Sequence, residues 1–75
     1  MRKNLMLSII KDNQIDCPQE LNEVYFDSLE IARKKGVELL KRYNCDVFII
    51  RKLTTGIGHY KTIGYFNRLN EYIRW

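Results

Sequence analysis

One segment of the sequence carries a full set of helix signals, and it lies between stretches that carry strand signals. At 3.6 residues per turn its apolar positions share an arc of about 100°. These positions are Leu29, Ala32, Gly36, Leu39, Leu40 and Tyr43. Asp27 as N-cap with Glu30 three positions later predicts the start, and Asn44, suited to a left-handed conformation, predicts the end. We therefore predict an amphipathic helix over residues 28–43 with this stripe against a sheet.

The other face of the predicted helix carries charges that pair along the helix itself. Each is four positions from an opposite charge: Glu30, Lys34, Glu38 and Arg42. Such pairs stabilise a helix by about 0.2 to 0.5 kcal/mol each. Gly36 lies on the apolar stripe, although glycine inside a helix costs about 1 kcal/mol relative to alanine. We interpret Gly36 as the point where the helix comes too close to the sheet for a side chain to fit.

Strand signals flank this helix. Residues 4–10 are rich in Leu and Ile, and residues 47–53 are β-branched and aromatic, which is typical of a central strand. Residues 54–58 predict a turn, after which residues 59–66 return as the second strand of a hairpin. Residues 11–20 are expected to form a polar loop, and residues 24–26 a short extended segment before the helix.

The last residues fit two structures. Leu69, Tyr72 and Ile73 suit a short helix capped by Asn67, whereas residues 67–70 suit a tight turn into a final strand. The helix is the slightly favoured alternative, and the strand stays open. The predicted fold class is α+β, with one amphipathic helix packed on a three- to four-stranded, mostly antiparallel sheet and a short C-terminal helix as an option.

The length of 75 residues predicts a single domain spanning residues 1–75. A chain of this size buries only about 60% of the surface that its unfolded form exposes. Its core supplies about 3 to 5 kcal/mol, so a homodimer is one way to supplement it. No apolar stretch approaches the roughly 20 residues that cross a bilayer, so no membrane association is expected.

Few residues suggest catalysis. His59 is the one histidine, and it lies beside a glycine turn, where a surface or strand role is the commoner one. Cys17 and Cys45 stand 28 residues apart and form neither a disulfide framework nor a CxxC pattern. We expect two reduced thiols in a cytoplasmic protein, with Cys45 buried next to the central strand. The protein is predicted not to be an enzyme, and no catalytic residue is assigned.

Neither metal nor cofactor binding is predicted. Residues 12–16 superficially resemble a calcium loop but lack its glycine and its distal bidentate glutamate. Gly56 and Gly58 suggest a phosphate-binding loop only weakly, because no Lys-Ser/Thr pair and no helix start follow them. A solvated loop and a hairpin turn account for these two features.

Charge is unevenly distributed along the chain, whose net charge is +4. Residues 12–30 contain six acids and no Lys or Arg, while residues 51–75 contain five Lys and Arg against one acid. The same final third mixes cations with aromatic residues, which is what binding of RNA or another single-stranded nucleic acid requires. The predicted nucleic-acid-binding residues are Arg51, Lys52, His59, Tyr60, Lys61, Arg68 and Arg74. Alternatively, these aromatics supply the core and the cations only keep the domain in solution.

Residues 24–32, VYFDSLEIA, and residues 46–50, DVFII, resemble short accessory proteins of bacteriophages. In those proteins an extended segment ends in an FDSLEEA-like helix start and a β-rich strand follows. The resemblance covers about half of the chain and transfers no functional residue. It implies non-catalytic proteins that act in the host cytoplasm on a host enzyme, on a defence or toxin protein, or on RNA.

Two functions therefore stay open. The first is a nucleic-acid-binding module, with RNA favoured, that uses the basic and aromatic final third. The second is an inhibitor or adaptor that docks directly on a host protein through the acidic loop and exposed aromatics.

Overall fold

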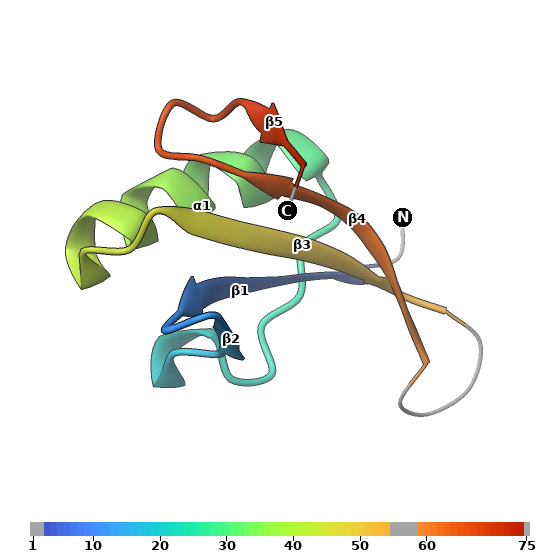
Figure 1. Ribbon diagram of the computed structural model, residues 1–75. Coiled ribbons are helices and arrows are strands. Elements are labelled where there is room, and N and C mark those ends of the chain that lie inside the picture. Colours follow the sequence, from blue (N-terminus) through green and yellow to red (C-terminus); the bar gives the residue numbers. More distant parts are fainter. Residues whose placement is uncertain (1–2, 55–58, 75) are drawn as a thin grey trace.

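A computed structural model describes residues 3–54 and 59–74 of the chain (Figure 1). Its elements, in chain order, are β1 (Leu5–Lys11), β2 (Gln14–Asp16), the 3₁₀ helix η1 (Gln19–Leu21), α1 (Leu29–Tyr43), β3 (Val47–Leu53), β4 (Tyr60–Phe66) and β5 (Tyr72–Ile73). The strands form one antiparallel sheet in the order β2-β1-β3-β4-β5, and α1 lies against one face of it. The predicted α+β class is confirmed, with β3 at the centre of the sheet.

The helix begins one residue later than its first cap signal. Ser28, not Asp27, is the N-cap: its backbone is extended and its Oγ accepts the Ile31 N–H at 3.3 Å. Both residue types cap helices well, so the prediction of Asp27 was wrong by one position. The helix ends as predicted, because Asn44 adopts the left-handed conformation with φ 55° and ψ 47°.

The buried face of α1 is narrower than the predicted stripe. Its four buried residues are Ala32, Gly36, Leu39 and Leu40. Leu29 and Tyr43, at the two ends of the stripe, remain 40% and 37% exposed. The stripe therefore contacts the sheet through the middle of the helix only.

Close approach of α1 to the sheet at Gly36 is confirmed. A Cβ built on Gly36 would lie 2.5 Å from two ring carbons of Phe48. The Phe48 ring has little freedom to move, because it is fully buried and stacks on Phe66 with ring centroids 5.2 Å apart. Glycine at this position thus lets the helix backbone rest on an aromatic ring.

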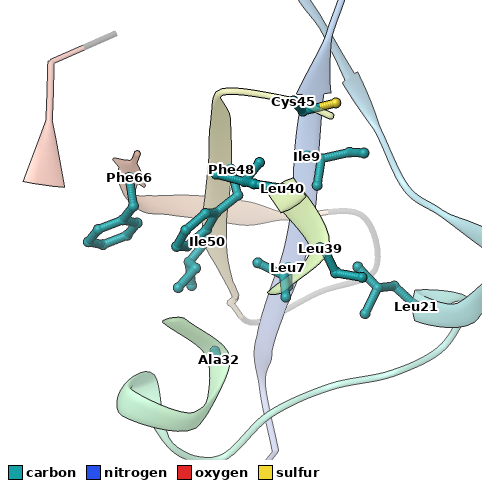
Figure 2. Close-up of a cluster of buried hydrophobic side chains, with 10 residues drawn as sticks. All are labelled: Leu7, Ile9, Leu21, Ala32, Leu39, Leu40, Cys45, Phe48, Ile50 and Phe66. Atoms are coloured by element: carbon teal, nitrogen blue, oxygen red, sulfur yellow. The ribbon is translucent and has the colours of Figure 1, made fainter. Parts of the chain in front are cut away.

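The main core lies between α1 and the sheet (Figure 2). Its members are Leu7, Ile9, Leu21, Ala32, Leu39, Leu40, Cys45, Phe48, Ile50 and Phe66. A second, smaller cluster of Ile10, Val47 and Ile49 lies on the opposite face, where Tyr65 and Ile73 pack against it. Successive side chains of a strand point to opposite faces, so β1 and β3 contribute to both clusters.

Residues 11–20 are more ordered than the polar loop that we predicted. Asp12 and Asn13 both have positive φ, at 54° and 63°, and they join β1 to the edge strand β2 in a tight hairpin. Asp and Asn tolerate this conformation better than most residues, which is the local signal for the turn. After η1, Phe26 forms an isolated antiparallel bridge with Leu5, as expected for the extended segment.

The end of the described chain is a strand, so the slightly favoured C-terminal helix was wrong. The Asn67 side chain accepts the N–H groups of Leu69 and Glu71 at 2.9 and 3.0 Å. Asn70 then takes a positive φ of 62°, which reverses the chain into β5. The side chain of Asn67 holds a turn here because asparagine bonds nearby backbone groups as readily outside a helix as at its cap.

Candidate nucleic-acid interface

The β3–β4 hairpin brings together five of the seven residues predicted to bind nucleic acid. Arg51 and Lys52 come from β3, Tyr60 and Lys61 from β4, and His59 directly precedes β4. We call these five residues the basic hairpin surface. In Figure 1 this end of the hairpin, at lower right, points away from α1.

Lys52 and Lys61 are register partners in this hairpin, and both are exposed. Partner residues in an antiparallel pair share a face, with Cβ atoms about 4.5 to 5.5 Å apart. Across the described ranges, the ion pairs of basic residues involve Lys34, Lys35, Arg42 and Arg68, and none includes either of these two lysines. The fold thus places two like charges side by side without a carboxylate, an arrangement that costs stability unless an anion is present.

A β-bulge sets this pairing. Between Ile50 and Arg51 the register shifts, so that Ile50 pairs with Gly64 and Arg51 pairs with Thr62. The extra residue is Ile63, which packs against the main core. If the strands paired regularly, with Ile63 in place but no bulge, Ile63 would stand opposite Arg51 and Thr62 opposite Lys52. Bulges re-aim the side chains that follow them, and this one turns Lys61 to the face that carries Lys52.

The face of the hairpin opposite α1 carries Arg51 and Tyr60. The Arg51 guanidinium lies 5.3 Å from the centroid of the Tyr60 ring, within cation–π range. Its Nη2 donates to Ser8 Oγ at 3.4 Å, and Ser8 is fully buried. Tyr60 is 42% exposed. One face of the hairpin thus presents two ammonium groups and the other presents a guanidinium stacked on an aromatic ring.

Arg68 lies at the other end of the sheet, where its guanidinium is hydrogen-bonded to other groups of the chain. Its Nε donates to the Cys45 carbonyl at 2.8 Å, and its Nη2 donates to Asn44 Oδ1 at 3.0 Å. The Oδ1 atom of Asp46 lies 3.6 Å from Arg68 Nε. These contacts fix the junction between α1 and β3, so we do not include Arg68 in the basic hairpin surface.

The remaining predicted residues differ in position. His59 is exposed, and its carbonyl accepts from the backbone N–H and the hydroxyl of Thr54, which holds the two strands together at this end. Arg74 is exposed and directly follows β5, which pairs with Tyr65 and Phe66 at the opposite end of β4 from Tyr60 and Lys61. The predicted turn glycines, Gly56 and Gly58, lie outside the described residues.

In the acidic segment, Glu20 bonds to several side chains of α1, which the sequence did not indicate. The Glu20 carboxylate accepts from Arg42 Nη1 at 2.6 and 2.8 Å and from the Tyr43 hydroxyl at 2.8 Å. Lys35 lies 3.6 Å from the same carboxylate. The Tyr43 hydrogen bond, followed by Arg42, lowers the pKa of Glu20, and the same hydrogen bond raises the pKa of Tyr43. Glu20 therefore holds η1 against α1.

Exposed apolar side chains gather where the N-terminal half of α1 meets the β4–β5 turn. Leu69 is 78% exposed and Tyr72 is 70% exposed. Arg33 joins the two elements, because its Nε donates to Asn70 Oδ1 at 2.7 Å and its Nη2 to the Asn70 carbonyl at 2.5 Å. Leu29, Glu30, Arg33 and Asn70 line an open pocket of about 340 Å³ there.

The described residues contain no group of three His, Cys, Asp or Glu side chains arranged to hold a metal ion. Cys17 and Cys45 are both free, and Cys45 is buried as predicted. Within residues 3–54 and 59–74, no helix has the length and hydropathy needed to span a bilayer.

Comparison with known proteins identified no relative: no family model matches the chain, and neither the curated proteins nor the solved structures contain a significant match.

Proposed function

We propose that this protein is a non-catalytic nucleic-acid-binding protein that contacts the phosphates of a single strand, with RNA favoured, through the basic hairpin surface. The observation that carries the proposal is the pairing of Lys52 with Lys61. Two neighbouring ammonium groups without a carboxylate partner repel each other in the free protein. Neighbouring phosphate groups of one strand, each bound to one of the two lysines, offset that repulsion.

The exposed ring of Tyr60, within the basic hairpin surface, favours a single strand over a duplex as the ligand. Tyr60 is 42% exposed and contacts one cation of β3, Arg51, across the hairpin. Unpaired bases stack on exposed aromatic rings, whereas the bases of a duplex are already stacked on one another. A strand whose phosphates contact Lys52 and Lys61 and whose base stacks on Tyr60 would use both faces of the hairpin.

Salt dependence tests this proposal. The affinity for a fluorescently labelled oligouridine RNA is measured by anisotropy over a range of salt concentrations. For single strands, each lost phosphate contact reduces the magnitude of the negative slope of log K against log salt by about 0.7. The Lys52→Met/Lys61→Met variant should lower the slope by about twice that amount. Lys34→Met, which removes a lysine paired with Glu30 on α1, is the matched control and should leave the slope unchanged. Equal slopes for all three proteins would contradict the proposal.

Direct docking on a host protein is the second candidate, and one observation favours it. Leu69 and Tyr72 are the two most exposed large apolar side chains among the described residues. In the sequence they lie on either side of Asn70, which lines the open pocket together with Leu29 and Arg33. Exposed apolar patches rimmed by polar groups mark protein interaction sites. On this proposal the chain is a phage-encoded counter-defence inhibitor or adaptor in the host cytoplasm, or forms a homodimer through the same patch.

A pull-down from bacterial lysate, with and without nuclease, separates the two candidates. A partner that is retained after nuclease treatment, and lost with Leu69→Ser/Tyr72→Ser, supports direct docking. A partner that is lost on nuclease treatment and with Lys52→Met/Lys61→Met supports nucleic-acid binding. Analytical ultracentrifugation of the purified protein reports whether the partner is a second copy of the chain.

A further inference from the structure

The structure leaves one buried hydrogen-bond donor of a side chain without an acceptor among the described residues, the Nε–H of Arg51. Arg51 lies on the face of the hairpin opposite α1, and its side chain is only partly buried overall. Buried donors without partners are rare in folded proteins and each one calls for an explanation. Methionine or lysine would cover the same apolar neighbours without this unpaired group, so packing alone does not account for an arginine.

The guanidinium of Arg51 is also held more weakly than the other hydrogen-bonded guanidinium groups in the described part of the chain. Arg33, Arg42 and Arg68 each donate to an acceptor at 2.8 Å or less. The one hydrogen bond of Arg51 has a length of 3.4 Å and ends on the neutral hydroxyl of Ser8. This length lies beyond the ordinary range of about 2.7 to 3.2 Å. The hydrogen bond to Ser8 therefore opposes rotation of the Arg51 side chain only weakly.

We propose that Arg51 forms a phosphate subsite that opens only on binding, when its guanidinium turns away from Ser8 and Tyr60 and presents Nε–H and Nη2–H together to one phosphate group. The rotation is needed because Nε is fully covered in the free protein. Paired donors of this kind match two phosphate oxygens, which is the geometry that favours arginine over lysine. The proposal rests on the proposed nucleic-acid binding and adds to it a second contact, on the other face of the hairpin from Lys52.

Rotation of Arg51 also uncovers the ring of Tyr60. The guanidinium lies over this ring in the free protein, 5.3 Å from its centroid. Once the guanidinium has moved to a phosphate, an unpaired base can occupy the position that it leaves. The subsite therefore couples a phosphate contact to a stacking contact on the same strand.

Three variants test the subsite. Arg51→Met keeps an unbranched apolar stem but lacks the guanidinium, so it should melt no lower than the wild type. Its affinity for oligouridine RNA should fall on the order of tenfold, as expected for loss of a charge-assisted bidentate contact. Arg51→Lys keeps the charge and should retain the salt slope while losing part of the affinity. Lys34→Met, on α1, is the control that removes one cation elsewhere and should bind as the wild type does.

Nuclear magnetic resonance of the arginine Nε–Hε groups gives a direct readout. In the free wild-type protein the Arg51 signal should exchange slowly with solvent, and it should shift on titration with RNA along the same isotherm as the backbone amides of Lys52 and Lys61. Inorganic pyrophosphate is the second probe, because it supplies the phosphate without a base and should shift the Arg51 signal as well.

The outcomes separate the subsite from the proposed function. If RNA shifts the amides of Lys52 and Lys61 but leaves the Arg51 signal unchanged, the subsite is overturned and nucleic-acid binding stands. If Arg51→Met binds RNA as the wild type does but melts lower, Arg51 is a packing residue only. If neither probe shifts any signal of the hairpin, the proposed function fails and the subsite fails with it.

Discussion

Lys52 and Lys61 face each other across the β3–β4 hairpin as direct register partners. A hydrophobic or oppositely charged partner at either position would make a more stable hairpin, because like charges directly opposite destabilise a sheet. The arrangement is therefore unfavourable for the isolated fold and useful to a protein that binds an anion.

Charge reversal at one of these lysines should stabilise the protein and weaken RNA binding. Lys52→Glu converts the repelling pair into an attracting one, for an expected gain of about 0.2 to 1 kcal/mol in the free energy of unfolding. Urea denaturation measures the gain, and anisotropy measures the loss of affinity. The double variant Lys52→Glu/Lys61→Glu restores a like-charge pair and should return the stability toward that of the wild type. A single variant that is less stable than the wild type would show that the two side chains do not interact.

Alanine at Gly36 should destabilise the protein, although alanine is the better helix former. The helix gains about 1 kcal/mol from the replacement. The new Cβ would lie 2.5 Å from the Phe48 ring, which is held between α1 and Phe66. Overpacking of this kind costs about 1 to 3 kcal/mol, so the net change should be a loss. Urea denaturation measures it. In a Phe48→Leu background the same substitution should cost less, and a higher melting temperature of Gly36→Ala alone would refute the close contact.

Replacement of Arg68 should affect stability and leave the salt slope of RNA binding unchanged. Arg68→Met removes the hydrogen bonds to Cys45 and Asn44 that fix the end of α1. The Cys45 carbonyl loses a charged donor, so we expect a loss of about 1 to 2 kcal/mol in the free energy of unfolding. Thermal denaturation and the anisotropy assay are run on the same preparation. A salt slope lowered by about 0.7 would instead place Arg68 among the phosphate contacts.

Stability should fall in acid through Glu20. Hydrogen bonds from Tyr43 and Arg42 lower the pKa of Glu20 below its ordinary value of 4.5. A carboxyl group whose pKa is lower in the folded state stabilises the fold above its unfolded pKa, and this contribution is lost as pH falls through the folded pKa. Melting temperatures of Glu20→Gln should therefore depend less on pH than those of the wild type below pH 4.5.

Glu30→Gln, which removes a surface acid of α1 paired with Lys34, is the comparison for this titration. Its melting curve should keep the acid dependence of the wild type. If Glu20→Gln and the wild type lose stability in parallel on acidification, Glu20 does not hold η1 to the helix.

The sequence predicts those parts of the fold in which a local pattern and the tertiary structure agree. This holds for the α1 stripe, for the run of β-branched residues in β3 and for Gly36 inside the helix. For each of them the local pattern and the packing allow the same single interpretation, and the structure confirms it. Asn67 has two readings, since its side chain bonds nearby backbone N–H groups equally well at a helix start and in a turn. Pairing of Tyr72 with Phe66 of β4, in a short hairpin, decides for the strand β5.

The candidate site was predicted in composition and not in arrangement. The excess of cations from residue 51 onward is visible in the sequence, but it does not reveal that Arg68 reaches back to Asn44 while Lys61 makes no ion pair with a described carboxylate. The two-residue turn at Asp12 and Asn13 was recognisable from its residue types, whereas β2 after it was not, because its three residues are all exposed and show no strand pattern. The bulge at Ile63 has only a weak signal, the isolated glycine Gly64 beside it, because a glycine inside a strand often marks a bulge but does not say which residue is extra.

That bulge makes the lysine pair depend on how the strands are paired and not on the length of β4. If the same residues paired without a bulge, Ile63 would stand opposite Arg51, and Lys61 would stand opposite Leu53 on the face away from Lys52. Loss of the single codon for Ile63, by contrast, would give a regular strand in which Thr62 still stands opposite Arg51 and Lys61 opposite Lys52. A descendant chain that lacks this residue would therefore keep the same pair of cations and lose only the contact of Ile63 with the main core.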